Sequence, residues 1–308
     1  ATAATVMLYG GSNFARIAAL RSDGIRFICH SNHPLDYFLK RGDMYPDTEG
    51  SIVTYYINED IFPLLDSFLI AAQKIPSLKY EVVIIENGNK EKTDIHLQVE
   101  EKYPFASVTI LGENLGYGRA HNLTIDAGFD YHLVLNPDIE FFPDSLLTAL
   151  EFMENNEQCG LLSPQCYWRN GDRQYLCKRY PDVSVLLIRA FAPKAIQSIF
   201  RKKLEYYCMK EELQAENILL NPPIVTGCFM LFRTKVLTSL GGFDKDFFLY
   251  FEDTDLSLRA RKITDVAYVP GVKVLHHGGN VSKKGLKHIL FFTSSMIKFF
   301  RKHGWRFV

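Results

Sequence analysis

Apolar and polar positions along the chain fall into blocks of two kinds. Between residues 51 and 141, short apolar runs rich in Val, Ile, Leu and Tyr alternate with longer stretches in which apolar residues recur every three or four positions. The short runs are typical of buried strands, and the longer stretches are typical of amphipathic helices. Strands that alternate with helices favour a mostly parallel sheet flanked by helices. The pattern therefore predicts an α/β domain with a Rossmann-like sheet.

Polar clusters follow the predicted strands of this region. In an open parallel sheet, ligands bind beyond the carboxyl ends of the strands. We therefore expect a ligand site near these clusters, which are Asn58-Glu59, Glu86-Asn87-Gly88, Glu113-Asn114 and Asn136-Pro137-Asp138.

The pattern before residue 51 is a separate unit. Residues 4–30 have the pattern of strand, glycine turn, helix and strand, and a polar linker follows near Tyr45-Pro46. The turn Gly10-Gly11-Ser12 could meet a phosphate at a helix N-terminus. It lacks the GxGxxG spacing, so a plain tight turn is favoured. We assign residues 1–50 to an N-terminal βαβ-like extension to which the sequence gives no role.

The rest of the chain divides into two parts. Strand and helix patterns continue to residue 282, although residues 151–223 are less regular. Residues 283–308 have the pattern of a basic amphipathic helix. We therefore expect one main domain over residues 51–282, followed by this C-terminal helix.

Charge and composition narrow the class of protein. The 35 basic and 35 acidic residues cancel, which argues against a protein that binds nucleic acid through bulk charge. No stretch approaches the roughly 20 consecutive apolar residues of a membrane span, and the N-terminus lacks the pattern of a signal peptide. The six cysteines include no CxxC pair and are typical of reduced thiols. These features predict a cytoplasmic location.

Asp138 and His276 are candidate metal ligands. Asp138 follows an apolar strand at a proline break, where a carboxylate is well placed to bind a hard cation such as Mg²⁺ or Mn²⁺. An ordinary turn aspartate is equally compatible with this position. His276 follows another predicted strand, and a neutral imidazole is a good metal ligand. A lone histidine at a strand end is more often structural, so His276 gains weight only beside Asp138 and Asp253.

The acidic cluster Glu252-Asp253-Thr254-Asp255 opens a predicted helix. Asp255 and Arg259 are four positions apart and could simply pair. Asp253 follows an aromatic run over residues 247–251, and a carboxylate held against apolar walls has the raised basicity that a general base needs. Asp253 is therefore the stronger catalytic candidate.

A glycine-rich loop, residues 113–122, leads into another predicted helix. Its glycines allow the backbone to approach a ligand closely. Arg119 could pair with a phosphate, and Asn122 could bond a ribose or a base. A plain glycine loop is the alternative.

Taken in order, these segments resemble the inverting glycosyltransferases of family 2, which have the GT-A fold. ENLGYGRAHN resembles the NxGFxxGxN loop, VLNPDIEF resembles the LNPD form of the metal motif, and GGFDKDFFLYFEDTDLSLR resembles GGFDExFFMYxEDxDLxxR. Four other segments resemble motifs of the same family, namely SIVTYYIN, VVIIENGN, VTGCFMLFR and PGVKVLHHGG. The resemblance runs from about Ser51 to Ser282 and is greatest to bacterial rhamnosyltransferases of O-antigen and related surface polysaccharides. The departures are an extra residue before Asn58, Glu86 where Asp is usual, and Asn136 where many relatives have Asp.

This resemblance implies roles for individual residues. Asp253 would deprotonate the acceptor hydroxyl, with Glu252 beside it in the catalytic group. Asp138 would bind a divalent cation, Mn²⁺ or Mg²⁺, and His276 would bind the same metal or contact phosphate. The nucleotide site would contain Thr54, Tyr55, Glu86, Asn87, Asn114, Gly118, Arg119 and Asn122. The sugar and acceptor pocket would be shaped by Gly227, Cys228, Gly242, Phe243 and Asp244.

The implied reaction is transfer of a sugar from a nucleotide-sugar donor to a hydroxyl of a polyprenyl-linked or oligosaccharide acceptor. dTDP-L-rhamnose is the favoured donor, and a UDP-hexose is the alternative. Inversion is expected, because a retaining double displacement needs a second, nucleophilic carboxylate, for which the sequence offers no clear candidate. A nucleotidyltransferase is disfavoured, because TYYINED lacks a Gly-rich basic loop for a triphosphate. The presence of Asp138, Asp253 and His276 together disfavours a catalytically silent nucleotide-sugar-binding module.

Basic and apolar residues are mixed in two segments, residues 178–203 and 283–306. Either segment could be an ordinary helix packed on the core. We favour peripheral attachment to the anionic inner face of the plasma membrane, where a polyprenyl-linked acceptor would lie. Aromatic residues among the lysines of the second segment support this interpretation, namely Phe291, Phe292, Phe299, Phe300 and Trp305.

Overall fold

The computed structural model describes residues 46–76, 78–125, 128–278 and 285–307. The N-terminal strand–helix–strand pattern, its Gly10-Gly11-Ser12 turn and nearly all of the expected extension over residues 1–50 lie outside these ranges.

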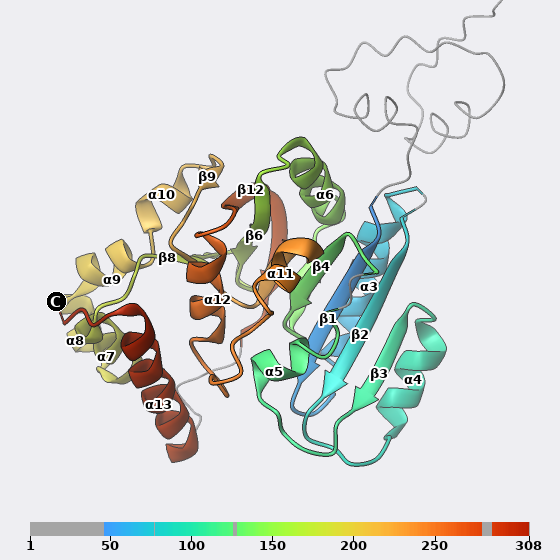
Figure 1. Cartoon of the computed structure of the whole chain (residues 1–308), viewed down its shortest axis with the longest axis horizontal. Helices are drawn as coiled ribbons and strands as arrows, with labels where there is room; N and C mark the ends of the chain where they lie inside the picture. Colours follow the sequence, from blue (N-terminus) through green and yellow to red (C-terminus); the bar gives the residue numbers. More distant parts are fainter. Residues whose placement is uncertain (1–45, 77, 126–127, 279–284, 308) are drawn as a thin grey trace, which may run out of the picture. The chain divides into compact units, whose positions relative to one another are not determined.

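One mixed sheet organises the described part of the chain (Figure 1). Its strand order is β3-β2-β1-β4-β11-β6-β12-β5. The first four strands are parallel, and they are β1 (Thr48–Thr54), β2 (Tyr80–Glu86), β3 (Ala106–Ile110) and β4 (Tyr131–Leu135). The other half contains β11 (Phe229–Arg233), β6 (Cys159–Tyr167), β12 (Asp265–His276) and β5 (Ile139–Phe141). The expected mostly parallel sheet is confirmed, with β11 antiparallel to both of its neighbours.

Four short strands complete the sheets. They are β7 (Arg173–Gln174), β8 (Cys177–Lys178), β9 (Leu219–Leu220) and β10 (Ile224–Val225). β7 pairs with β6, β9 pairs with β12, and β8 pairs with β10 in a separate two-stranded sheet.

Some helices of the described ranges cover the sheet and others extend beyond its edge (Figure 1). They are α3 (Ile61–Gln73), α4 (Asp94–Lys102), α5 (Tyr117–His121), α6 (Ser145–Asn155), α7 (Val183–Phe191), α8 (Lys194–Ile199), α9 (Arg201–Tyr207), α10 (Lys210–Gln214), α11 (Thr234–Ser239), α12 (Glu252–Ala260) and α13 (Leu286–His303). Val134 of β4 packs with Leu256 of α12 and with Phe243 in one buried cluster. Since adjacent side chains of a strand point to opposite faces, Leu133 and Leu135 face the other helical layer.

The start of β1 differs from the expected polar linker. Thr48 and Glu49 are already in register with both β2 and β4, so the boundary expected after residue 50 falls inside this strand. Glu49 is buried, and its Oε2 lies 2.8 Å from Nδ1 of His132 on β4. A polar TEG segment can enter the sheet because a histidine that is distant in sequence satisfies its carboxylate.

The C-terminal helix α13 packs against the main domain. Phe299 and Phe300 are fully buried in a cluster with Phe247 and Phe251, the aromatic residues that precede α12. These two phenylalanines are therefore unavailable to a membrane, and this part of the membrane argument is wrong. The alternative, a helix packed on the core, is confirmed for the second half of α13. No helix in the described ranges is long and apolar enough to span a membrane.

Candidate active site

Asp138 and His276 meet although they are far apart in the sequence. Asp138 directly precedes β5, and β5 pairs with the end of β12 so that Ile139 lies opposite His276. The backbone N–H of His277 donates to the Asp138 carbonyl oxygen at 3.0 Å. This register leaves Oδ1 of Asp138 3.3 Å from Nε2 of His276. Sheet pairing has therefore brought the two expected metal ligands together.

Gln174, which the sequence did not indicate, orients the His276 ring. Its Nε2 donates to the His276 carbonyl oxygen at 2.7 Å, and its Oε1 lies 2.9 Å from Nδ1 of the same residue. A carbonyl oxygen only accepts, so the amide orientation is set and Nδ1 carries the proton. Nε2 then faces Asp138 and can offer a lone pair to a cation, in the arrangement by which outer partners usually orient metal-binding histidines.

The electrostatics of this pair suit a cation. Burial alone would raise the pKa of Asp138, but the nearby His276 imidazole and backbone N–H groups outweigh burial and lower it. Among the described residues, no group of three or more His, Cys, Asp or Glu side chains converges on one point. One carboxylate and one imidazole fit a cation whose other ligands are substrate phosphates, which is a common way of binding Mg²⁺.

Asp253 stands at the start of α12, on the other side of the site. Its Oδ2 accepts a hydrogen bond from the Gly227 N–H at 2.8 Å, and its Oδ1 accepts one from the Thr254 N–H at 2.7 Å. The turn before it is strained, since Tyr250 and Phe251 have positive φ values of 70° and 67°. Burial raises the pKa of Asp253, although the hydrogen bonds to Gly227 and Thr254 oppose the rise. A raised basicity is what a general base requires.

Glu252 lies beside Asp253 in a different electrostatic state. It is 5% exposed, and its Oε2 has no hydrogen-bond partner within the described ranges. Burial, followed by the charge of Asp253, raises the pKa of Glu252 to about 8. At neutral pH Glu252 is therefore mainly protonated and adds little negative charge beside Asp253.

Asn136 and Tyr117 lie between these two groups. The Tyr117 hydroxyl oxygen is 2.7 Å from the carbonyl oxygen of Gly227 and 3.1 Å from Oδ1 of Asn136. Nδ2 of Asn136 is 3.4 Å from Nε2 of His276. Tyr117 belongs to the glycine-rich loop that the sequence indicated. A tyrosine at this position did not by itself predict a contact with Gly227 or Asn136.

The expected nucleotide residues at the ends of β1 and β2 are close together. Tyr55 is 55% exposed and its ring lies 4.4 Å from that of Tyr56. The Asn87 N–H donates to the Thr54 carbonyl oxygen at 2.9 Å, and Oδ1 of Asn87 accepts from the Leu115 N–H at 3.2 Å. Asn87 therefore joins the end of β1 to the glycine-rich loop.

Glu86, which was expected in the nucleotide site together with Asn87, faces away from the glycine-rich loop. It is fully buried, and its carboxylate bonds the His96 ring on α4 and the Ile57 N–H. In this structure the Glu86 carboxylate therefore faces α4 and the β1–α3 connection, and Asn87 is the one of the two that contacts the loop. The sequence could not show this, because His96 follows in the next helix and carries no motif.

The remaining loop residues mainly hold α5 against the turn at residues 241–244. Asn122 accepts from the Phe243 N–H and donates to the Phe243 carbonyl oxygen, both at 2.8 Å. A Cβ on Gly118 would lie 2.7 Å from Phe243, and one on Gly242 would lie 2.3 Å from Asn122. Asn122, Gly118 and Gly242 thus have packing roles whether or not a ligand is bound.

The other predicted residues contact the segments around the site. Arg119 Nε donates to the Lys245 carbonyl oxygen at 2.7 Å, and the exposed Asn114 accepts from the Gly116 N–H at 2.8 Å. Asp244 is tied to Lys302 of α13. Cys228, which is buried, accepts from the Asn136 N–H through its carbonyl oxygen at 2.9 Å.

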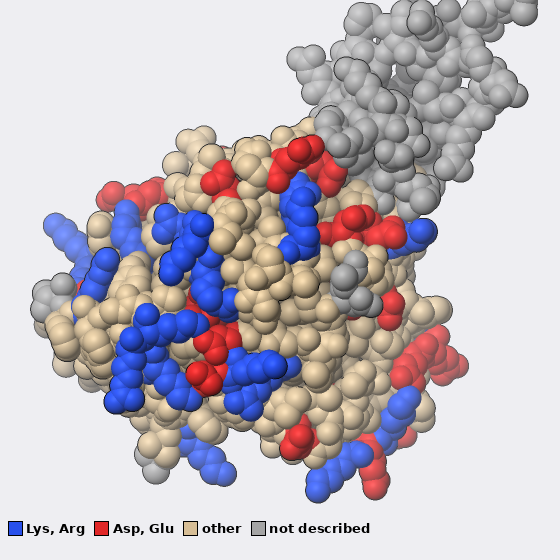
Figure 2. Space-filling model, viewed as in Figure 1, with Lys and Arg blue, Asp and Glu red and all other residues tan. Residues whose placement is uncertain are grey.

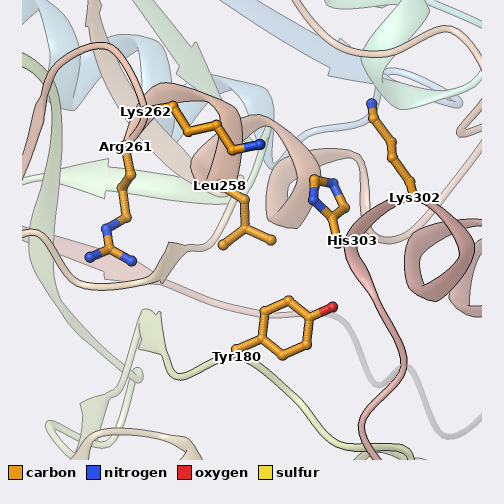
Figure 3. A pocket seen from close by; sticks show the side chains of 6 residues that line it. All are labelled: Tyr180, Leu258, Arg261, Lys262, Lys302 and His303. Atoms are coloured by element: carbon orange, nitrogen blue, oxygen red, sulfur yellow. The ribbon is translucent and has the colours of Figure 1, made fainter.

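A separate cavity of about 440 Å³ lies toward the other end of α12 (Figure 3). Its lining residues are Tyr180, Leu258, Arg261, Lys262, Lys302 and His303. In the view of Figure 2, basic side chains gather over the region of α9, α12 and α13 with acidic side chains among them. The cavity contains none of the predicted catalytic or metal-binding residues, and Lys302 and His303 already pair with Asp255.

Comparison with known sequences identifies relatives of the chain. The sequence model of a family described as glycosyltransferase-like family 2 matches residues 51–289. The N-acetylglucosaminyl-diphospho-decaprenol L-rhamnosyltransferase of Mycobacterium tuberculosis is 28% identical over 228 residues, which are 70% of this chain and 72% of that protein. Rhamnosyltransferase WbbL of Escherichia coli is 27% identical over 180 residues, which are 54% of this chain and 63% of that protein.

Solved structures share the fold. The mannosyltransferase PcManGT of Pyrobaculum calidifontis, solved with GDP-Man and Mn²⁺, superimposes with a TM-score of 0.52 at 18% identity, covering 87% of this chain and 72% of that one. The UDP complex of Staphylococcus aureus TarS residues 1–349 superimposes with a TM-score of 0.51 at 16% identity, covering 82% of this chain and 65% of that one. The fold of the chain is therefore the GT-A fold, as expected.

Proposed function

Since the chain belongs to glycosyltransferase-like family 2 and is a glycosyltransferase, we propose that it transfers one sugar from a nucleotide-sugar donor to an acceptor hydroxyl with inversion. The observation that supports this most directly is the meeting of three residues from distant parts of the chain. Asp138 and His276 lie 3.3 Å apart. Asn136, Tyr117 and Gly227 connect His276 to Asp253 through successive side-chain and backbone contacts.

Asp253 acts as the base in this proposal. The acceptor hydroxyl gives its proton to the Asp253 carboxylate while its oxygen attacks the anomeric carbon, and the bond from that carbon to the diphosphate oxygen breaks. Because Glu252 is mainly protonated at neutral pH, it is a poor nucleophile, which favours a single inverting displacement over a double one.

Asp138 and His276 would hold a divalent cation, Mn²⁺ or Mg²⁺. When bound, the cation neutralises the charge that develops on the departing diphosphate. Two observations support a cation here: the paired carboxylate and imidazole, and the orientation of His276 by Gln174. The PcManGT structure, which has the same fold, was solved with Mn²⁺.

The donor that we favour is dTDP-L-rhamnose. Two relatives, from Mycobacterium tuberculosis and Escherichia coli, are named as rhamnosyltransferases. A UDP-hexose is the second candidate, because the TarS structure of the same fold contains UDP. The exposed Tyr55, next to Asn87, is placed at the ends of β1 and β2 where either pyrimidine base would lie.

The acceptor that we favour is lipid-linked, at the cytoplasmic face of a membrane. The name of the Mycobacterium tuberculosis relative contains a decaprenol-linked acceptor. Exposed apolar residues on α7 and α8 and on the first half of α13 offer a docking face, and they are Leu187, Phe191, Ile196, Ile199, Ile289 and Leu290. Lys194 on α8 adds positive charge, and Phe191 contacts Phe292 to join the two parts. A nucleic-acid partner is not proposed.

Asp253→Asn tests the function. Loss of a general base lowers turnover by about 10²- to 10⁴-fold, and Asn keeps the size of the side chain and one of its two acceptor oxygens. We expect sugar transfer from dTDP-L-rhamnose to a polyprenyl-diphosphate acceptor to fall by this factor, while calorimetric binding of dTDP stays within twofold. Asp246→Asn, at an exposed carboxyl, is the matched control. Normal transfer by Asp253→Asn would refute Asp253 as the base. If the wild-type enzyme transfers sugar only from a UDP-hexose, the proposed donor dTDP-L-rhamnose is wrong.

A further inference from the structure

Tyr117 is held rigidly at the centre of the site. It is the first residue of α5, and its N–H donates to the Phe248 carbonyl oxygen at 3.1 Å. The preceding Gly116 has a φ of 85°, and a Cβ there would lie 2.2 Å from the same Phe248 oxygen. Only glycine permits this close approach, so the backbone position of Tyr117 is set by packing.

The Tyr117 ring rests on a buried polar chain. The ring lies edge-on to that of His121, with centroids 4.5 Å apart. Nδ1 of His121 is 2.7 Å from the Ser51 hydroxyl, which is 2.8 Å from Nε2 of His132. His132 in turn contacts Glu49. These hydrogen bonds fix the His121 ring, and the His121 ring fixes one side of Tyr117.

The Tyr117 hydroxyl has one hydrogen, which it shares between two acceptors that belong to different parts of the site. We call Gly227 and Asp253 the base arm, and Asn136, His276 and Asp138 the cation arm. The hydroxyl oxygen is 2.7 Å from the Gly227 carbonyl oxygen and 3.1 Å from Oδ1 of Asn136. One side chain therefore touches both arms, which come from segments far apart in the sequence.

On the base arm, the geometry of Gly227 transmits this contact to Asp253. The Gly227 N–H donates to Oδ2 of Asp253, and a Cβ on Gly227 would lie 3.1 Å from the Cβ of Asp253. The peptide and the carboxylate are thus packed closely. The Gly227 carbonyl oxygen and the Gly227 N–H belong to two peptide units that meet at the Gly227 Cα. A hydrogen bond to the carbonyl oxygen therefore limits displacement of this Cα, and with it displacement of the N–H that orients the base.

The phenol remains a donor throughout the working pH range. Burial raises the pKa of Tyr117 well above its ordinary value, and the nearby Cys228, Glu252, Asp253 and Asp138 raise it further. Tyr117 is therefore unsuited to proton transfer.

We propose that Tyr117 is a positioning residue whose hydroxyl couples the base arm to the cation arm, so that Asp253 and the leaving diphosphate keep their relative geometry. This inference rests on the proposed function.

Tyr117→Phe removes only the hydroxyl and tests the proposal. Loss of one neutral hydrogen bond that acts on the transition state lowers kcat by about fivefold to tenfold. We expect this fall, with the KM for the nucleotide sugar changed less than twofold. Since the Gly227 N–H lowers the pKa of Asp253, loosening it also moves the acid limb of the kcat–pH profile to higher pH.

Tyr268→Phe is the matched control. The Tyr268 hydroxyl is buried and donates to Oε1 of Gln165 at 3.1 Å, within β12 and β6 and outside both arms. Its loss is expected to leave kcat and the pH profile unchanged. Rates are divided by the active fraction, which is measured from the stoichiometry of nucleotide binding.

The outcomes separate this proposal from the proposed function. A Tyr117→Phe enzyme with normal kcat and an unmoved pH profile overturns the positioning role and leaves Asp253 as the base. The positioning role is also overturned if only the active fraction falls, because Tyr117 would then be structural. If Asp253→Asn retains transfer, the assignment of the base fails, whatever Tyr117→Phe shows.

Discussion

Asp253 and Asp255 lie two positions apart at the start of α12, yet their surroundings are opposite. Asp255 is fully buried, and Nε of Arg259, Nζ of Lys302 and Nε2 of His303 each lie 2.7 Å from one of its oxygens. Asp253 has no cationic partner within the described ranges and is held by the N–H groups of Gly227 and Thr254. A buried carboxylate paired with Arg259 and Lys302 is a structural anchor, whereas one held by N–H and hydroxyl groups without a cation keeps its basicity. The comparison shows that the partners decide the role of each carboxylate.

The largest effect on stability is expected at the anchor. Asp255→Asn removes the counter-charge of Arg259 and one of the two counter-charges of Lys302, which also pairs with Asp244. Breaking a buried ion pair from one side costs about 3 kcal/mol or more. We expect the urea-derived free energy of unfolding to fall by about 3 kcal/mol, with turnover per folded molecule within threefold of wild type. The Asp246→Asn variant is again the control. If Asp255→Asn instead loses most of its turnover and keeps its free energy of unfolding, Asp255 has a catalytic role and the distinction from Asp253 is wrong.

A smaller effect is expected on the cation side, where Gln174 orients His276. Removing an outer partner of a metal-binding histidine typically weakens metal affinity by about 10- to 100-fold. We expect Gln174→Leu to weaken Mn²⁺ binding by this factor when free Mn²⁺ is followed by electron paramagnetic resonance. Gln214→Leu, at an exposed glutamine that bonds Tyr175, should bind as the wild type does. Equal Mn²⁺ affinities for the two variants would show that Gln174 does not contribute to metal binding.

The third prediction concerns Glu252 and pH. Its folded pKa of about 8 lies above the unfolded value, so the folded state binds more protons than the unfolded state between these two values. This contribution to stability is fully present below pH ~4.3 and is lost as the pH rises toward 8, by at most about 1.4 kcal/mol per pH unit. We expect Glu252→Gln to remove this decline in urea unfolding at pH 5, 6.5 and 8. Parallel pH profiles for the two proteins would contradict a protonated Glu252.

The smallest effect is expected at the outer surface. The second half of α13 is tied to Asp255, but the first half exposes Leu290, and α8 exposes Ile199. We expect Ile199→Asp with Leu290→Asp to weaken co-sedimentation with phosphatidylglycerol vesicles by about tenfold or less, without changing the free energy of unfolding. Ile263→Asp, at an exposed position before β12, is the control. Equal pelleting of the two proteins would remove the docking face from the proposal.

Local patterns were sufficient for much of the fold and for part of the site. The alternation of strands and helices predicted the parallel half of the sheet, and the strand ends predicted where Asp138 and Asn87 would lie. The pairing of Asp255 with Arg259 was also predicted, because residues four apart share one helix face. Each of these relations depends on near neighbours in the sequence.

Other features depended on segments far apart in the chain. The Tyr117 hydroxyl meets Gly227, the Gln174 amide meets His276, and the Glu49 carboxylate meets His132. No periodicity links these positions, so the sequence could indicate neither the contacts of Tyr117 nor the buried start of β1. The expected membrane role of Phe299 and Phe300 failed for the same reason, since an amphipathic helix buries its apolar side equally well in a core.

The sequence by itself therefore determined the class of fold, the family and the identity of the candidate base and metal ligand. The tertiary structure decided which carboxylates are paired and which remain basic. It also decided which aromatic residues are buried and which side chains connect the two arms. The physical reason is that strand and helix periods are local properties of the chain. Burial and charge pairing are set by whichever distant segments the sheet order brings into contact.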